Sequence, residues 1–461
     1  MKNKRNILTN KDDRNVCAHI LYAFVIKGIS LVVSLFSMPL YIKYFNNDTV
    51  LGLWVTILSV LSWINICDLG LGNGMRNRLT EAVSLKNTEL GKTYISSTYV
   101  ITAAIIIPVI ITIICIIKFA DINSFFNISR DEISESCLFV SLCILLLGIG
   151  INFVLRIVNY TLYAIQKSSI NNLLSLFTSL LPLLYVLMFN GSGNSQRNLI
   201  TLSVVHAISL NLPLVAATIL LFSGKQLREY RPSLKYFDFS TAKSMLGFGL
   251  QFFMAQIFFM ILMSTNEIII TRLFSAEYVV EYSIYYRIFH VIGSLFTLAL
   301  TPIWSKVTKD FAEKNYKKIR TTNHILYAVS VLAVVGEFIA VVVLQPIVNI
   351  WLGDEAIPVN NFTAIVFAIF GSLYIINTVL TTVANGIGCL KTQIYFYGIG
   401  AILKIPVIYL VSTVWNNWSV VVLFNSIILL AFCIFQFFWI EIKINNLIKS
   451  KNNGGYDNVT F

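Results

Sequence analysis

Residues 224–249, GKQLREYRPSLKYFDFSTAKSMLGFG, form the longest polar interruption in an otherwise apolar chain. Six apolar segments precede this stretch and six follow it. Its charged side chains are Lys225, Arg228, Arg231, Lys235 and Lys243 against only Glu229 and Asp238. Because Lys and Arg accumulate in the cytosolic loops of membrane proteins, the stretch predicts a cytosolic connector and fixes the expected side of every other loop.

The composition predicts a polytopic α-helical membrane protein. The chain has 461 residues, of which 57% are hydrophobic and 12% charged, and its mean hydropathy is +0.76. These values are too apolar for a soluble globular protein, and the chain is too long for a single anchor. The first apolar run, residues 16–42, is too long for a signal-peptide core, so we expect a retained helix. The net charge of +12 comes from cations in short loops, which favours membrane topology over a nucleic-acid partner. The seven cysteines show no CxxC spacing, which argues against a disulfide framework or a zinc site.

Twelve segments are long enough to cross a bilayer, which takes about 20 apolar residues per helix. The first six are residues 16–42, 51–71, 94–117, 137–163, 170–189 and 199–222. The second six are residues 246–270, 278–304, 324–350, 362–386, 393–414 and 418–440. The expected domains are therefore a six-helix bundle at 1–223, a basic cytosolic connector at 224–245, a second six-helix bundle at 246–442 and a polar cytosolic tail at 443–461.

Loop charges agree with this count, because a missed helix would invert every later loop. The N-terminus, the loop at 75–92, the connector and the loop at 306–321 are basic and are expected inside, whereas the loops around Asp121 to Glu135 and around Asp354 and Glu355 are acidic and are expected outside. Both termini are then cytosolic. Five tryptophans near segment ends are expected at the membrane interface. They are Trp54, Trp304, Trp351, Trp415 and Trp418.

The two halves of the chain resemble each other. YIKYF ends the first segment at position 45 and ITRLF ends the seventh at position 274, an offset of 229. Similar charged loops follow segments 2 and 8 at nearly the same offset. Since the offset spans six helices, the two repeats have the same orientation in the membrane, as in transporters built from parallel repeats.

No catalytic or cofactor motif is found. The nearest phosphate-loop candidate, ending at Lys92 and Thr93, has Lys86 where the first glycine is required. GLGNG at Gly70 to Gly74 lacks the βαβ context of a dinucleotide site and is expected to turn the chain out of the membrane. HExxH, GxSxG and Asp-x-Asp are all missing. We therefore expect no cofactor, no metal and no enzymatic activity.

Polar residues inside the predicted segments are the candidate functional residues, because an ionised side chain at a helix centre costs about 2.5–3.5 kcal/mol. Stripes at helical spacing occur in segments 1, 4 and 8 and predict an aqueous lumen. The candidate lumen cations are Lys27, Arg156, Arg287 and Lys404, and the candidate polar or ion-coupling residues are Glu267, His290, Glu337, Asn152, Asn159, Asn377, Thr381 and Asn385. Four cations and two carboxylates give a lining of net charge +2, which with hydroxyl and amide groups suits an anionic, sugar-bearing substrate.

Each candidate also has a structural interpretation. Arg156 stands near the cytosolic end of its segment, where a long side chain reaches the interface. Lys404 could pair with Glu337 or Glu267. His290 could be a hydrogen-bonded packing residue instead of a proton carrier, and Glu267 could sit in the outer interface.

Two stretches carry a resemblance to a known family. NDTVLGLW at 47–54, continuing through WINICDLGLGNGMRNRL at 63–79, resembles the first-repeat signature of the polysaccharide-biosynthesis flippases, the O-antigen lipid-linked oligosaccharide transporters. NEIIITRLFSAE at 266–277 and YSIYYR at 282–287 are similar to that family's segment 7 and its continuation. The chain departs from the family pattern at Val280 and Glu281, where glycine is usual.

This resemblance implies a V-shaped, MATE-like pair of six-helix bundles in the bacterial inner membrane. The implied cargo is an undecaprenyl-diphosphate-linked oligosaccharide repeat unit. The implied partners are a polysaccharide polymerase and a chain-length regulator, with H⁺ or Na⁺ coupling. Two alternatives stay open: a multidrug extrusion pump of the same superfamily, and a membrane-bound polysaccharide polymerase or ligase.

Overall fold

The computed structural model describes residues 40–66, 70–126, 128–224, 227–275, 277–353 and 356–452, together with scattered positions between 22 and 37. Throughout these residues the secondary structure is helical, with no strand. The chain divides into two compact units, residues 1–250 and 251–461. The predicted first segment and Lys27, Asp354 and Glu355 lie largely or wholly outside the described residues.

Ten helical stretches among the described residues are long and apolar enough to cross a membrane, and they correspond to predicted segments 3–12. Predicted segment 2 is α2 (Asp48–Ile66), whose apolar core Thr49–Leu61 is shorter. The remaining helices of the N-terminal unit are α3 (Leu71–Ser84), α4 (Thr88–Phe119), α5 (Ile122–Phe125), α6 (Glu135–Leu155), α7 (Ile157–Ala164), α8 (Ser168–Met188) and α9 (Ser195–Ser223). The C-terminal unit contains α11 (Asn266–Leu273), α12 (Glu277–Ala312), α13 (Tyr316–Val342), α14 (Leu344–Leu352), α15 (Asn361–Gly386), α16 (Lys391–Ser412) and α17 (Val420–Asn452).

Side chains before the first turn begin several of these helices. Asn87, Ser134, Asn194 and Asn360 each accept a hydrogen bond from a backbone N–H in the first turn of the helix that follows. Such caps satisfy amide groups that have no partner within the helix. Prolines lie inside α4, α8, α9, α12 and α16, which is common in membrane helices because neighbouring groups re-satisfy the freed backbone.

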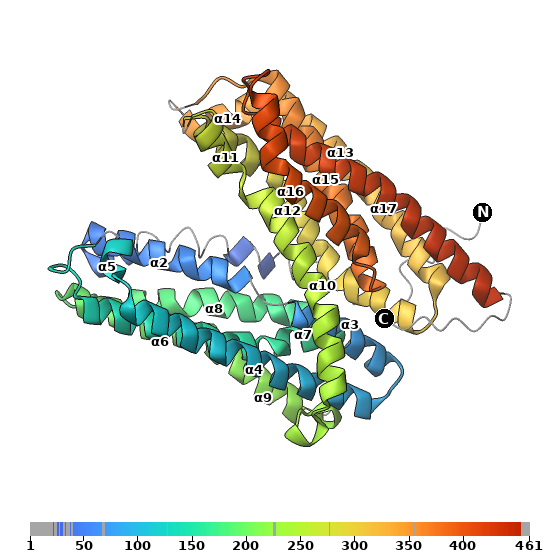
Figure 1. Ribbon diagram of the computed structural model, residues 1–461, viewed down its shortest axis with the longest axis horizontal. Helices are drawn as coiled ribbons and strands as arrows, with labels where there is room; N and C mark the ends of the chain where they lie inside the picture. The colour runs from blue at the N-terminus through green and yellow to red at the C-terminus, as the bar shows by residue number, and fades with distance from the viewer. Residues whose placement is uncertain are drawn as a thin grey trace. The chain divides into compact units, whose positions relative to one another are not determined.

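Each unit has its own apolar core. In the N-terminal unit α6 packs against α4 and α9, and Trp54, Ile57 and Ile149 are fully buried. In the C-terminal unit α15 packs against α12, α13 and α17 (Figure 1), and its face holds Phe367 in contact with the Tyr285 ring. The central helix α15 therefore organises the C-terminal unit.

The polar connector is folded onto the N-terminal unit. It contains two short 3₁₀ turns, Arg228–Tyr230 and Leu234–Tyr236, before α10 (Phe239–Ser264) begins. Leu227 and Tyr230 are buried in a small cluster with Met75, Leu79 and Ile95. Ser97 Oγ accepts from the Asp238 amide at 3.1 Å and donates to the Asp238 carbonyl at 3.3 Å. The connector is thus part of the fold of the first half.

Several boundaries differ from the sequence predictions. Segment 4 is broken at Arg156 into α6 and α7, and segment 7 is broken at Thr265 into α10 and α11. The helix α17 continues through the predicted tail as far as Asn452. Trp54 and Trp418 are buried in their cores at 0% and 5% exposure, whereas Trp351 and Trp415 are exposed.

The glycine motif behaves differently from the prediction. Gly70 has φ of 63° and precedes α3, so it makes the expected turn. Gly72 and Gly74 instead lie inside α3. A Cβ on Gly72 would stand 2.0 Å from the Tyr160 ring, so this glycine permits close packing of α3 on α7.

Candidate functional site

The main candidate site is a buried polar network in the C-terminal unit, centred on Lys404 of α16. The Lys404 side chain is 1% exposed, and its Nζ donates to Asn266 Oδ1 at 2.6 Å and to the Leu262 carbonyl oxygen. Asn266 Oδ1 also accepts from Asn425 Nδ2 at 2.9 Å, and Asn266 Nδ2 donates to Tyr282 Oη at 2.9 Å. Asn266 of α11 thus joins α12, α16 and α17, and Lys404 adds the link to α10.

The acceptors of the Lys404 amine are neutral. Within the described part of the chain no ion pair joins Lys404 to Glu267 or Glu337, the two carboxylates considered from the sequence. Glu267 is exposed in the first turn of α11, and Glu337 is buried in α13 with no hydrogen-bond partner. An ammonium group is a donor only, so two oxygen acceptors support its charged form without cancelling the charge.

The two candidate residues in the polar stripe of α12, Arg287 and His290, have different surroundings. Arg287 is on the exposed face of the helix. His290 stacks on Tyr286 with ring centroids 4.8 Å apart and stands edge-on to Tyr374 at the same distance. The imidazole is therefore held between two phenol rings, which agrees with the packing interpretation of this residue.

The polar residues of α15 connect to α16. Tyr397 Oη donates to Asn377 Oδ1 at 2.5 Å, and Gln393 Nε2 donates to Asn385 Oδ1 at 2.8 Å. Thr381 Oγ1 donates to the Thr378 carbonyl of its own helix at 3.1 Å. Asn377 and Asn385 thus act as bridges between two helices, whereas Thr381 satisfies its hydroxyl locally.

In the N-terminal unit, three candidates lie around the break between α6 and α7. Arg156 donates from Nη2 to Asn152 Oδ1 at 3.2 Å and lies 5.0 Å from the centroid of the Phe153 ring. Asn152 Nδ2 donates to the Leu210 carbonyl of α9 at 2.9 Å. The Asn159 carbonyl oxygen accepts from Asn171 Nδ2 at 2.8 Å. Arg156 is half-buried and combines the expected charge with a structural contact at the helix break.

Sequence reasoning missed three polar groups that the structure brings into these cores. Asn266 and Asn425 complete the Lys404 network, and the signal that could have found Asn425 is an amide inside the apolar run 418–440. His206 of α9 stands edge-on to Trp54 at 5.8 Å, and its Nδ1 has no hydrogen-bond partner. Lys27 lies outside the described residues, so its relation to these groups stays a prediction.

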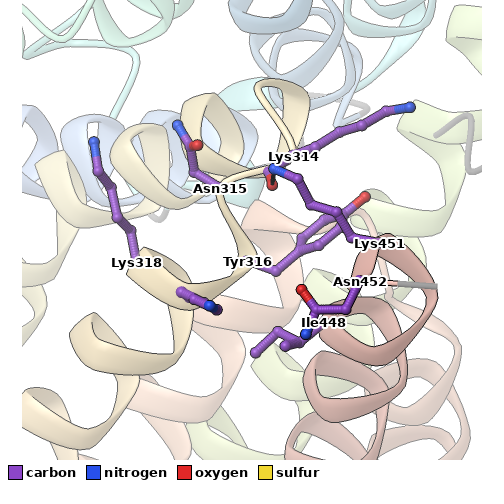
Figure 2. A pocket seen from close by; sticks show the side chains of 8 residues that line it. Lys314, Asn315, Tyr316, Lys318, Ile448, Lys451 and Asn452 are labelled. Carbon is purple, nitrogen blue, oxygen red and sulfur yellow. Dashed lines mark hydrogen bonds between the residues drawn. The ribbon is translucent and has the colours of Figure 1, made fainter. Parts of the chain in front are cut away.

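A basic cavity lies at one end of the C-terminal unit. Figure 2 shows its lining, which comes from the α12–α13 loop, the first turn of α13 and the C-terminal end of α17. The cavity has a volume of about 210 Å³, and Lys451 Nζ donates to the Lys314 carbonyl at 2.7 Å. Its lining residues include Lys314, Lys317, Lys318 and Lys451. The predicted basic loop and the end of α17 therefore lie on the same side, as an even number of intervening spans requires.

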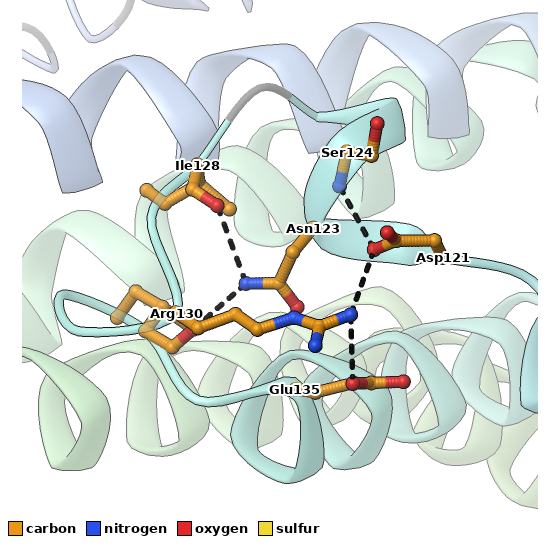
Figure 3. Close-up of polar contacts among 7 residues, drawn as sticks. Asp121, Asn123, Ser124, Ile128, Arg130 and Glu135 are labelled. Carbon is orange, nitrogen blue, oxygen red and sulfur yellow. Dashed lines mark hydrogen bonds and ion pairs between the residues drawn. The ribbon is translucent and has the colours of Figure 1, made fainter.

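The acidic loop after α4 is ordered by ion pairs and side-chain hydrogen bonds (Figure 3). Arg130 Nη2 lies 3.3 Å from both Asp121 Oδ1 and Glu135 Oε2, and buried Asn123 donates to the Ile133 carbonyl at 2.8 Å. The Ser124 backbone N–H and the Arg130 guanidinium hold the pKa of Asp121 below its ordinary value. Since Arg130 offsets part of the acidity of this loop, its carboxylates have a structural role as well as the expected one in topology.

Comparison with solved structures identifies the fold. No family profile matches the chain. The chain is similar to a MATE protein in the bent conformation, with a TM-score of 0.76 and 14% identity over 96% of this chain and 97% of that one. It is also similar to an outward-facing multidrug-resistance MATE transporter of the MOP superfamily, with a TM-score of 0.72, 14% identity and coverage of 95% and 96%. The chain is also similar to a MOP-superfamily transporter from Pyrococcus furiosus, with a TM-score of 0.70 and 14% identity over 94% of this chain and 95% of that one. The chain therefore has the all-helical, two-bundle fold of these MATE structures, which confirms the predicted fold class.

One curated relative has a narrower description. The chain is 21% identical over 286 residues to the "Putative O-antigen transporter" of Salmonella typhimurium, a match that covers 61% of this chain and 62% of the relative. The match thus spans about three-fifths of that protein. Both similarities agree with the resemblance to the polysaccharide-biosynthesis flippases found in the sequence.

Proposed function

We propose that the protein is a flippase for lipid-linked oligosaccharides. It moves an undecaprenyl-diphosphate-linked O-antigen or related repeat unit from the cytosolic to the periplasmic leaflet of the bacterial inner membrane by alternating access. Both termini are cytosolic in this proposal. A polysaccharide polymerase and a chain-length regulator act on the product.

The buried amine of Lys404 is the observation that carries the proposal. When it is protonated, its positive charge is not cancelled, because both of its acceptors are neutral oxygens and no carboxylate in the described residues pairs with it. Charges at this depth act through a low dielectric and attract an anion more strongly than they do in water. A diphosphate carries the matching charge, whereas a cationic drug is repelled.

Two further observations support an anionic, hydroxyl-rich cargo. Arg156 in the N-terminal unit and Arg287 in the C-terminal unit add guanidinium groups, which bind phosphate oxygens in bidentate geometry. Asn152, Asn377 and Tyr282 add amide and hydroxyl groups, which are both donors and acceptors, and each forms a hydrogen bond within the protein in this structure. The polyprenyl tail needs no such groups, since it can stay in the lipid.

The proposed function is tested by deleting the gene and analysing the lipids of each leaflet. We expect undecaprenyl-diphosphate repeat units to accumulate on the cytosolic leaflet. Accumulation of unpolymerised units on the periplasmic leaflet would instead point to a polymerase. Increased sensitivity to cationic drugs with normal lipids would point to the multidrug pump, which shares the fold.

Complementation of the deletion tests the cationic residues. Lys404→Met and Arg287→Ala should each lower the rate of flipping by at least about tenfold, a barrier increase of about 1.4 kcal/mol. Arg272→Ala is the matched control, because Arg272 is an exposed arginine of α11 outside the network. Normal flipping in both test variants would remove the main support for the proposal.

A further inference from the structure

Glu337 of α13 is an acidic side chain fully enclosed within the C-terminal unit. It is 0% exposed, although it lies in a strongly apolar helix whose other face is exposed at Val335, Phe338 and Ile339. The helix α13 packs on α15, α12 and α17, and these four helices run side by side in Figure 1. The carboxyl group therefore points into the unit.

Gly371 of α15 provides the space that this carboxyl group occupies. A Cβ on Gly371 would stand 2.8 Å from the Glu337 Cδ and Oε2 atoms and 3.0 Å from Oε1. Such distances are shorter than any ordinary contact, so only glycine allows the carboxyl group to lie here. The position is a fitted slot between α13 and α15.

The slot offers the carboxyl group no partner. Neither Oε1 nor Oε2 of Glu337 forms a hydrogen bond, and the hydroxyl group of the next residue, Ser372, is also buried without one. In the described residues, no titratable or charged group on α13 itself or on the packed elements α12, α15 and α17 forms a hydrogen bond or ion pair with Glu337, and α14 has no such group. Besides Glu337, the groups on these four helices are Glu277, Tyr278, Glu281, Tyr282, Tyr285, Tyr286, Arg287, His290, Lys306, Lys309, Asp310, Tyr316, Lys317, Lys318, Arg320, His324, Tyr327, Tyr374, Cys433, Glu441, Lys443, Lys449 and Lys451.

An ionised carboxylate enclosed without a cation or a hydrogen-bond donor is strongly disfavoured, and such a group is neutralised instead. We infer that Glu337 is a proton-binding site: it carries a proton while enclosed in the slot opposite Gly371 and loses that proton when the slot opens to water. The reaction breaks the carboxyl O–H bond, leaves a carboxylate and transfers the proton to water. Reprotonation of the carboxylate from water reverses these steps, so no other reactant is needed.

Coupling of this proton to transport rests on the proposed function, whereas proton binding does not. An enclosed slot favours the protonated form, and a hydrated slot favours the ionised form. The same proton occupancy therefore biases the α13–α15 contact towards the enclosed or the opened arrangement. A pH difference across the membrane then supplies a driving force for the conformational cycle.

The first test is infrared spectroscopy of the purified full-length protein in lipid nanodiscs. Wild type should show a protonated carboxyl C=O band at pH 7 that is missing in Glu337→Gln, with the same unfolding temperature in both. Gly371→Ala should displace the carboxyl group and shift or remove the band. Gly336→Ala is the matched control, because its Cβ would meet only Ile292 Cδ1 at an ordinary 3.7 Å, and the band should be unchanged. A wild-type spectrum identical to that of Glu337→Gln at pH 7 would overturn the inference.

The second test measures coupling in proteoliposomes. The probe is a short-chain polyprenyl diphosphate bearing N-acetylglucosamine, flipped with and without an imposed pH difference. We expect the pH difference to accelerate flipping several-fold in wild type and to leave the flipping rate of Glu337→Gln unchanged. A full response in Glu337→Gln would overturn the coupling role. Absence of wild-type flipping with the infrared band present would overturn the proposed function and leave the proton-binding site standing.

Discussion

The hub position of Asn266 in the Lys404 network makes a quantitative prediction about stability. Asn266→Leu removes one acceptor of the Lys404 amine, the acceptor of Asn425 Nδ2 and the donor to Tyr282 Oη. A hydrogen bond to a charged group contributes about 1.5–3 kcal/mol. Neutral side-chain hydrogen bonds between membrane helices average about 0.6 kcal/mol. One charged and two neutral bonds give an expected loss of about 3–4 kcal/mol in the free energy of unfolding.

Reversible denaturation of the full-length protein in mixed detergent and lipid micelles measures this loss. Asn266→Asp is the matched control, because it keeps an acceptor oxygen and places an opposite charge beside Lys404. It should retain most of the wild-type stability. Asn266→Leu introduced into a Lys404→Met background should cost only about 1 kcal/mol, since the two neutral bonds remain to be lost. An equal loss in both backgrounds, or a loss below about 1 kcal/mol in wild type, would refute the argument that the charged bond dominates.

Three other predictions address the N-terminal unit. Gly72→Ala should lower the free energy of unfolding by about 1–3 kcal/mol, because its Cβ meets the Tyr160 ring, whereas Gly52→Ala, with open space around it, should cause no loss in the same denaturation assay. Ser97→Ala removes both hydrogen bonds to Asp238, which contribute about 1 kcal/mol each, so trypsin should cleave the connector at least about tenfold faster. Thr93→Ala is the control, because it removes only a hydrogen bond within α4. The pKa of Asp121 is below the ordinary pKa of an aspartate. Its bonds to Ser124 and Arg130 should therefore be fully formed at any pH above that ordinary pKa and be lost as the pH falls through the lowered pKa. A carboxyl NMR titration with a midpoint at or above the ordinary pKa would contradict this.

The positions of the helices follow closely from the sequence, because apolar runs of membrane-spanning length are a strong signal. Predicted segments 3–12 each have a counterpart in the structure. The breaks at Arg156 and Thr265 were not predicted, since neither position has a proline and hydropathy averages over single residues. Next to the break at Arg156 the chain makes a tertiary contact that hydropathy does not report, from Asn152 to the Leu210 carbonyl of α9.

The partners of the polar residues could not be predicted from spacing alone. Their positions inside apolar segments marked Lys404 and Glu337 as candidate polar residues, and the sequence offered Glu337 or Glu267 as a possible partner of Lys404. The structure instead gives Lys404 an amide and a carbonyl oxygen, and it gives Glu337 the space above a glycine. A helical stripe fixes the face of one helix, whereas the identity of the partner depends on the depth and rotation of several helices at once.

Tryptophan positions show a similar limit. Nearness to a segment end predicts an interfacial ring, and Trp351 and Trp415 are exposed. Trp54 and Trp418 stand equally near segment ends and are buried, Trp418 with its Nε1 donating to Glu281 Oε2 at 3.1 Å. Rotation about the helix axis, which hydropathy does not report, decides between the two environments.

The folded connector has a consequence for the way the two repeats are joined. Leu227 and Tyr230 complete a cluster that belongs to the first repeat, so a chain cut at the polar stretch would expose the apolar residues beneath them. A cut at residue 250, where the compact units divide, would instead sever α10 in mid-helix. The described residues of the joint between the repeats are therefore divided between the core of the first repeat and the helix α10, and a break at either place would remove folded structure.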